Sequence, residues 1–152
     1  SFAAVLPLGL LLMLGLQLVL SYTGWGRRLF VIGSAAETAR LAGLPVDRIR
    51  ISAYALSGAL AAFAGVVIVG FYGQALATMG NPYLLGSVAA VVVGGASIFG
   101  GRGSVVGTVG GALVLGQVAT LVNVANLGAN IQQLIYGVIV LVVVALYGRR
   151  RD

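Results

Sequence analysis

The stretch AAVLPLGLLLMLGLQLVLSY, residues 3–22, has no charged residue over its whole length. A helix needs about 20 predominantly apolar residues to cross the ~30 Å hydrocarbon core of a bilayer. A proline and two glycines interrupt the run, but membrane helices tolerate these residues where neighbouring groups satisfy the freed backbone. The stretch therefore predicts a transmembrane helix.

Four more apolar runs follow, and with the first they lie at roughly 3–22, 51–71, 84–99, 105–122 and 131–147. The third run is short and ends at a double glycine, so both a full span and a re-entrant half-span stay open for it. We expect an all-α fold, a polytopic transmembrane helix bundle of about five spans. Residues 1–152 are expected to form a single transmembrane domain.

The composition also indicates that the chain lies in a lipid bilayer. Hydrophobic residues make up 60% of the chain and charged residues only 8%, and the mean hydropathy is +1.09. Soluble domains carry charges on about a quarter of their residues. The chain is therefore predicted to be a membrane protein with little room for a soluble domain.

Several chemistries are excluded by missing residue types. The chain has no Cys and no His, and its basic residues are all arginines. Disulfides, thiolate nucleophiles, zinc clusters and a P-loop are therefore ruled out. The acidic residues Glu37, Asp47 and Asp152 lie outside the apolar runs, which argues against a proton relay. We expect no catalytic, cofactor or metal site, and any transport must draw its energy from elsewhere.

The arginines predict the orientation. They lie between the first two runs, after the third run and at the C-terminus, namely Arg27, Arg28, Arg40, Arg48, Arg50, Arg102, Arg149, Arg150 and Arg151. Positive residues beside spans mark the cytoplasmic side. Five alternating spans place all of them, and the C-terminus, on that side. No basic stripe with interleaved aromatics exists, so nucleic acid is not expected as a partner.

Small residues recur every four positions in two of the runs. Gly103, Gly107 and Gly111 form one such ridge, and Gly86, Ala90 and Gly94 form another. Small-xxx-small ridges let helix backbones approach closely. We expect helix packing rather than ligand binding from these residues.

The one segment rich in charges of both signs is GSAAETARLAGLPVDRIRIS, residues 33–52. Ser34 and Glu37 have the spacing of a capping box, which predicts a short helix over 35–42. Gly43 suits a left-handed position after that helix, and Asp47 is expected to cap the second span.

Neutral polar residues are the candidates for a substrate pathway: Asn123, Asn126, Gln132 and Gln133. Amides suit an uncharged polyol such as a monosaccharide better than a charged solute, which calls for an opposing charge. The alternative is an ordinary extracytoplasmic loop with interhelical hydrogen bonds. The tyrosines lie mostly near the ends of the runs and are expected to anchor the membrane interface.

The stretch ETARLAG, residues 37–43, is similar to the EAA motif of ATP-binding cassette (ABC) importer permeases. The stretches at 44–58, 89–116 and 130–143 resemble the ribose- and xylose-type sugar permeases in the same order. Thr38 stands where the motif has Ala, and its later Ile and Leu-Pro are absent. The resemblance covers nearly the whole chain and implies the C-terminal half of a longer permease.

This resemblance implies a function. The short helix docks on a separate ABC ATPase subunit through Glu37, Arg40, Leu41, Gly43, Asp47 and Arg48. The further partners are an extracytoplasmic sugar-binding protein, a second permease copy and the lipid bilayer of the bacterial cytoplasmic membrane. The alternatives are a branched-chain amino-acid permease, a small homo-oligomeric channel or structural membrane protein, and, for the short helix, a mere connecting loop.

Overall fold

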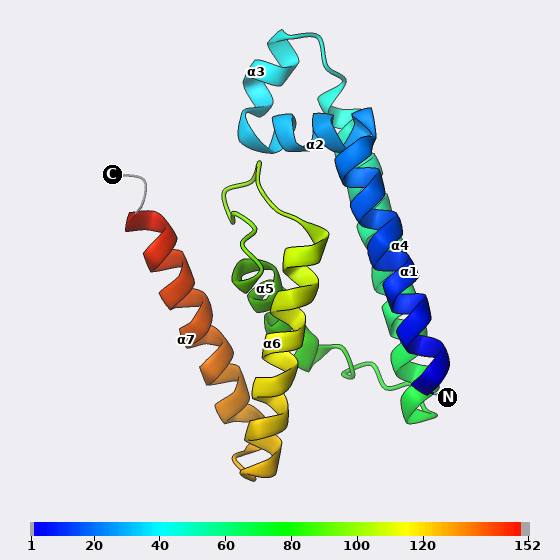
Figure 1. Ribbon diagram of the computed structural model, residues 1–152, viewed down its shortest axis with the longest axis vertical. Coiled ribbons are helices and arrows are strands. Elements are labelled where there is room, and N and C mark those ends of the chain that lie inside the picture. Colours follow the sequence, from blue (N-terminus) through cyan, green and yellow to red (C-terminus); the bar gives the residue numbers. More distant parts are fainter. Residues whose placement is uncertain (1, 150–152) are drawn as a thin grey trace.

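The computed structural model describes residues 2–149, and every regular element among them is a helix (Figure 1). The elements are α1 (Phe2–Tyr22), α2 (Gly24–Ser34), α3 (Ala36–Leu41), α4 (Val46–Tyr72), α5 (Asn81–Val93), α6 (Val105–Val124) and α7 (Gly128–Arg149). The predicted all-α bundle is confirmed. Arg150, Arg151 and Asp152 lie outside the described residues.

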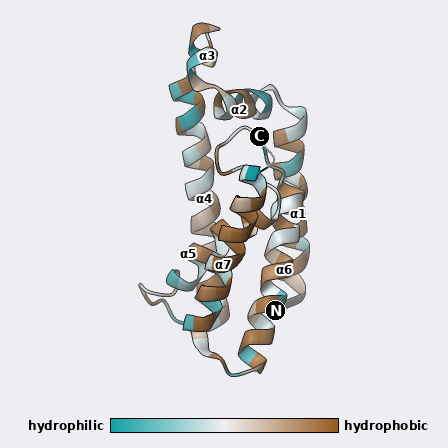
Figure 2. Ribbon diagram, turned by 90° about the vertical axis from the view of Figure 1, so that its left-hand side faces the viewer, coloured by the Kyte–Doolittle hydropathy of each residue, from teal (hydrophilic) through white to brown (hydrophobic). Residues whose placement is uncertain are grey.

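Helices α1, α4, α6 and α7 are each long and apolar enough to cross a membrane. They correspond to four of the five predicted runs. Apolar residues cover most of their length, whereas hydrophilic residues gather at α2, α3 and the start of α4 (Figure 2). Their exposed apolar side chains, such as Leu11, Val66 and Leu141, fit contact with lipid or with other membrane helices.

The remaining run, the third in chain order, forms helix α5, which has only 13 residues and is therefore about 20 Å long. Its helix ends in a Schellman motif, with Gly95 at φ +88° and the Ala96 N–H donating to the Val91 carbonyl at 3.1 Å. The non-helical segment 94–104 then carries the chain up to α2 before α6 begins (Figure 1). The third run is thus part helix and part folded loop.

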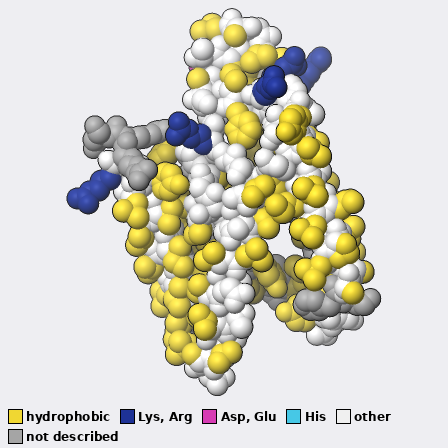
Figure 3. Space-filling view, viewed as in Figure 1, with side chains coloured by type: hydrophobic (Ala, Val, Ile, Leu, Met, Phe, Trp, Pro, Cys, Tyr) yellow, Lys and Arg dark blue, Asp and Glu magenta, His cyan; other side chains and the backbone are white. Residues whose placement is uncertain are grey.

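All the described arginines belong to segments at one end of the molecule, the end that holds α2, α3, the start of α4, the segment 94–104 and the end of α7 (Figure 1). We call this the arginine end. The positive side chains visible in Figure 3 lie there. The arrangement is the one that the alternating spans predict.

Helix α2 was not predicted. Thr23 caps it by accepting the Gly26 N–H at 3.3 Å, and the helix runs across the end of α1 (Figure 1). Helix α2 extends to Ser34, whose hydroxyl donates to the Phe30 carbonyl at 2.8 Å. The predicted capping box is therefore wrong, because Ala35 is the N-cap of α3 and no side chain caps it.

Helices α5, α6 and α7 pack together around Ala89, Ala90, Leu115 and Tyr136, which are all buried. On the other side of the molecule α1 and α4 flank an open apolar groove of about 270 Å³. The structure thus has a packed group of three helices beside a looser pair, and α2 extends at the arginine end from the pair across to the segment 94–104 (Figure 1).

Candidate functional site

Helix α3 is held on a small apolar core at the arginine end. Ile32 of α2, Ala39 of α3, and Val46 and Ile49 of α4 are buried against one another. The indole N–H of Trp25 also donates to the Ser52 hydroxyl at 2.7 Å, which joins α2 to α4. Helices α2, α3 and the start of α4 therefore form one cap, which we call the α2–α4 cap.

The outer surface of this cap carries the residues predicted to couple to an ATPase. Arg40 and Asp47 form an ion pair at 2.9 Å. Leu41, at the end of α3, is an apolar residue that is 84% exposed. Glu37 and Arg48 are exposed as well. The arrangement is an apolar knob surrounded by charges of both signs, which suits binding of another protein.

Gly43 has φ +81°, as predicted for the residue after the helix. Its N–H donates to the Arg40 carbonyl at 3.0 Å, and the next N–H, of Leu44, donates to Ala39 at 3.1 Å, which makes a Schellman motif. The predicted N-cap role of Asp47 is wrong. Pro45 is the N-cap of α4, and Asp47 lies in the first turn, where its carboxylate pairs with Arg40.

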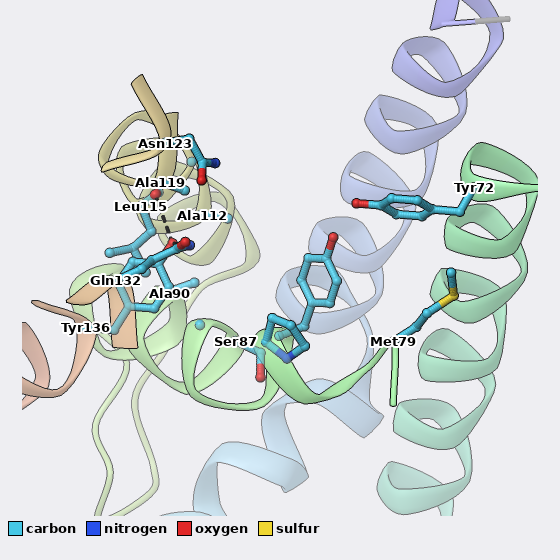
Figure 4. A pocket seen from close by; sticks show the side chains of 14 residues that line it. Tyr72, Met79, Ser87, Ala90, Ala112, Leu115, Ala119, Asn123, Gln132 and Tyr136 are labelled. Carbon is cyan, nitrogen blue, oxygen red and sulfur yellow. Dashed lines mark hydrogen bonds between the residues drawn. The ribbon is translucent and has the colours of Figure 1, made fainter. Parts of the chain in front are cut away.

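A second candidate region is a cavity of about 680 Å³ between α5, α6, the start of α7 and the end of α4. Figure 4 shows Tyr72 and Met79 on one side and the α6 and α7 residues on the other, with Ser87 of α5 between them. Small residues hollow out its wall: Gly86, Ala90, Ala112, Gly116 and Ala119. The volume lies in the range of about 300–1,000 Å³ usual for ligand pockets.

The polar groups of the cavity are uncharged. They belong to Tyr72, Tyr83, Ser87, Asn123, Gln132 and Tyr136, and no lining residue is acidic or basic. The Gln132 amide donates to the Tyr136 hydroxyl at 2.9 Å, which in turn donates to the Leu115 carbonyl at 3.2 Å. This chain fixes the Gln132 side chain at the cavity wall (Figure 4).

The structure brings two of the four predicted pathway residues together and places the other two elsewhere. Asn123 and Gln132 line the cavity. Asn126 has φ +55° and follows the end of α6, a left-handed position that Asn tolerates. Gln133 faces a different groove, formed along α7 with Asn130.

The predicted glycine ridge meets the neighbouring helix in part. A Cβ atom on Gly107 or Gly111 would collide with the backbone oxygen of Gly94 or Ala90, respectively. Gly103 instead lies before α6 and faces the Ala96 side chain, where a Cβ would come to 3.2 Å. Helices α5 and α6 therefore cross with their backbones in contact.

Residues 1–144 match the family model described as branched-chain amino acid transport system / permease component. The chain belongs to this permease family. Permeases of this kind are membrane transport subunits, which agrees with the four helices able to cross a bilayer. The protein is thus a multi-pass membrane permease.

Individual relatives of this permease are named for fructose, xylose and autoinducer 2. It is 43% identical over 79 residues to the fructose import permease protein of Rhizobium meliloti, a match that covers 52% of this chain and 22% of the relative. It is 37% identical over 87 residues to the xylose transport system permease protein of Escherichia coli, a match that covers 57% of this chain and 22% of the relative. The autoinducer 2 import system permease protein of Salmonella typhi is 36% identical over 80 residues, covering 53% and 24%.

The matched stretches thus span less than a quarter of these curated relatives. No solved structure matches the permease.

Tyr72, Tyr83 and Tyr136 were expected only as interface anchors, but all three line the cavity, and Tyr136 is 6% exposed. Tyr136 of α7 contacts α6 through its hydrogen bond to Leu115. This contact depends on tertiary packing, which the hydropathy of the sequence does not reveal.

Proposed function

We propose that the chain forms the membrane-spanning part of an ABC importer permease that moves a monosaccharide. Separate ATPase subunits drive it, and an extracytoplasmic binding protein delivers the sugar. The observation that carries the proposal is the uncharged lining of the 680 Å³ cavity in a chain of the permease family. Relatives named for fructose and xylose import support the same substrate class.

The chemistry of the cavity favours a sugar over an amino acid. An amino acid is a zwitterion, and its ammonium and carboxylate lose hydration when they enter a pocket without charged partners. Hydroxyl groups need only hydrogen-bond donors and acceptors, which the Asn123 and Gln132 amides supply. The aromatic face of Tyr72 adds an apolar surface. The branched-chain amino-acid permease remains the second candidate, because the family model carries that description.

The α2–α4 cap is the proposed docking surface for the ATPase. Its exposed knob, Leu41, suits a groove on a partner, and Glu37 and Arg48 offer charges at the rim. Buried apolar anchors with a polar rim are the usual anatomy of protein interfaces. The apolar core under α3 packs α3 against α2 and α4, so a force from the partner on α3 acts on a packed unit rather than on a flexible loop.

The arginine end is proposed to face the cytoplasm, with the C-terminus on the same side, because short loops rich in arginine stay on that side of bacterial membranes. The cavity then opens in the half of the permease nearer the binding protein. A second permease copy completes the pore, and lipid covers the exposed apolar helices. This orientation brings the cap to the side where ATP is available.

The proposal is tested by uptake into proteoliposomes that hold the full-length gene product and its ATPase, with the binding protein added outside. A panel of labelled monosaccharides and labelled leucine are offered with and without internal ATP. We expect ATP-dependent uptake of one or more sugars and none of leucine. ATP-dependent leucine uptake would favour the amino-acid permease. Uptake at the same rate with and without ATP would favour the alternative of a small homo-oligomeric channel.

A further inference from the structure

The segment between α5 and α6 touches α2 through glycines on both sides. A Cβ on Gly33 of α2 would lie 2.7 Å from the backbone nitrogen of Gly101. A Cβ on Gly100 would collide with the Gly33 carbonyl, and a Cβ on Gly101 would collide with the Ser34 hydroxyl. Two backbones therefore lie in direct contact, which only glycine at these positions allows. We call this the glycine contact.

Each side of the glycine contact is tied firmly to a functional region. On the first side, α2 carries Ile32, which is buried in the same core as Ala39 of α3. A push on α3 must therefore move α2 as well, since packed interiors transmit strain rather than absorb it.

On the second side, the segment 94–104 is a folded unit. The Ser97 N–H donates to the Arg102 carbonyl at 3.0 Å, and the Gly100 N–H donates back to Ser97 at 3.1 Å. The segment continues directly from α5, whose residues Ser87 and Ala90 line the cavity. Displacement of the segment thus displaces one wall of the cavity.

A further contact holds the other end of the segment. The side-chain oxygen of Gln17 in α1 accepts the Val105 N–H at 3.1 Å, one of the N–H groups that the start of α6 leaves without a helical partner. The Gln17 amide nitrogen donates to the Ser21 hydroxyl at 2.8 Å. The start of α6 is therefore anchored on α1, and the segment before it has a fixed end about which it can turn.

We propose that the glycine contact of Gly33 with Gly100 and Gly101 transmits movement of the α2–α4 cap to the α5 wall of the cavity. The contact works as a rigid link: the two surfaces stay together while the ATPase closes and opens. This inference rests on the proposed importer function, but it holds for any solute that the cavity carries. Gly33, Gly100 and Gly101 act as positioning residues and touch no substrate.

Gly33→Ala and Gly24→Ala form a matched test in one helix. Both glycines are helical residues of α2, but a Cβ on Gly24 meets nothing within 4 Å. Alanine at 33 has to push Gly101 away and loosen the link. We expect Gly33→Ala to lower solute uptake per ATP hydrolysed at least about fivefold, the lower range of allosteric coupling. Gly24→Ala should leave the ratio unchanged.

Co-purification of the ATPase and membrane insertion are measured on the same samples, because the inference predicts that Gly33→Ala retains both. Uptake per ATP equal to that of Gly24→Ala would overturn the inference. The wild type is scored first with sugars and leucine, and the variants are scored with whichever solute it carries. Uptake of the wrong class of solute would therefore contradict the proposed function, but the comparison of Gly33→Ala with Gly24→Ala would still test this inference.

A reversible cross-link tests the rigid link without Gly33→Ala. Residues 1–152 hold no Cys, so in a background without other cysteines Ser34→Cys with Gly101→Cys introduces a single pair. A Cβ at 101 would lie 3.0 Å from the Ser34 Cβ, below the ~3.5–4.5 Å usual across a disulfide, so the pair is within reach once the two surfaces move slightly apart. If the surfaces stay together, oxidation should preserve or raise the uptake of the reduced variant. A fall on oxidation would show that the surfaces must separate, and would overturn the inference.

Discussion

The guanidinium of Arg40 lies 2.9 Å from the Asp47 carboxylate, and this pair joins the end of α3 to the first turn of α4. Both side chains are largely in water, with 53% of Arg40 and 77% of Asp47 exposed. Exposed ion pairs contribute about 0.2–1 kcal/mol at most. The pair therefore orients the surface of the α2–α4 cap more than it stabilises the fold.

Asp47→Asn should separate these two effects. We expect a loss of less than about 1 kcal/mol in the free energy of unfolding, because the apolar core beneath stays intact. Binding of the ATPase should weaken more clearly, since the charged rim of the docking surface is altered. Thermal unfolding in detergent and a titration with the ATPase measure the two quantities. A large loss of stability with normal binding would mean that the pair is structural.

Orientation is tested by labelling single cysteines in the Cys-free chain. Thr38→Cys in α3 and Arg102→Cys in the segment 94–104 should react with an impermeant maleimide only from the cytoplasmic side. Ala77→Cys, which lies between α4 and α5 at the opposite end of α4, should react only from outside. The matching pattern in inverted vesicles is the control. Labelling of position 102 from outside would contradict the proposed orientation of the third span.

The crossing of α5 and α6 offers another matched pair. A Cβ on Gly111 would collide with the Ala90 carbonyl, whereas one on Gly110 meets nothing within 4 Å. Gly111→Ala should lower the free energy of unfolding by about 1–3 kcal/mol, the usual cost of overpacking. Gly110→Ala should leave it unchanged or raise it slightly, because alanine favours helix. Equal melting temperatures for the two variants would mean that the helices do not cross here.

The apolar runs allowed prediction of α1, α6 and α7, because hydropathy is a local property of a span. The same signal placed the start of α4 too late. Its first turn, with Asp47 and Arg48, is polar and extends beyond the apolar run. Helix α2 was missed for the opposite reason: GWGRRLFVIGS mixes charges, glycines and apolar residues, and only the capping residue Thr23 and the apolar pair Leu29 and Ile32 signal it.

The cavity was predicted only in part. Asn123 and Gln132 were pathway candidates for their chemistry and line the cavity, but nothing in the local sequence distinguishes Gln132 from Gln133, since the direction of each depends on how α7 packs. Tyr72 and Met79 come from a different part of the chain and reach the cavity through long-range folding. Glycine spacing indicated close packing without identifying the partner, so the glycine contact was also out of reach.

Gln132 and Gln133 provide the test of the cavity. Gln132→Ala removes a cavity-lining amide that donates to Tyr136, whereas Gln133→Ala alters an exposed neighbour outside the cavity. We expect Gln132→Ala to weaken sugar uptake about tenfold, which corresponds to ~1.4 kcal/mol. Gln133→Ala should behave as wild type. Uptake kinetics over a range of sugar concentrations give the comparison, and identical curves for the two variants would remove the cavity from the pathway.

The docking of α3 on the ATPase is the central claim, and Gly43→Arg with Gly73→Arg tests it most directly. Both glycines have positive φ, +81° and +69°, and open space around them, so arginine strains each backbone alike. Gly43 lies beside α3, whereas Gly73 ends α4 at the opposite end of the molecule. The measurement is ATP-dependent sugar uptake at equal membrane insertion. The account predicts at least a tenfold loss for Gly43→Arg and near-normal uptake for Gly73→Arg; equal uptake by the two variants would contradict it.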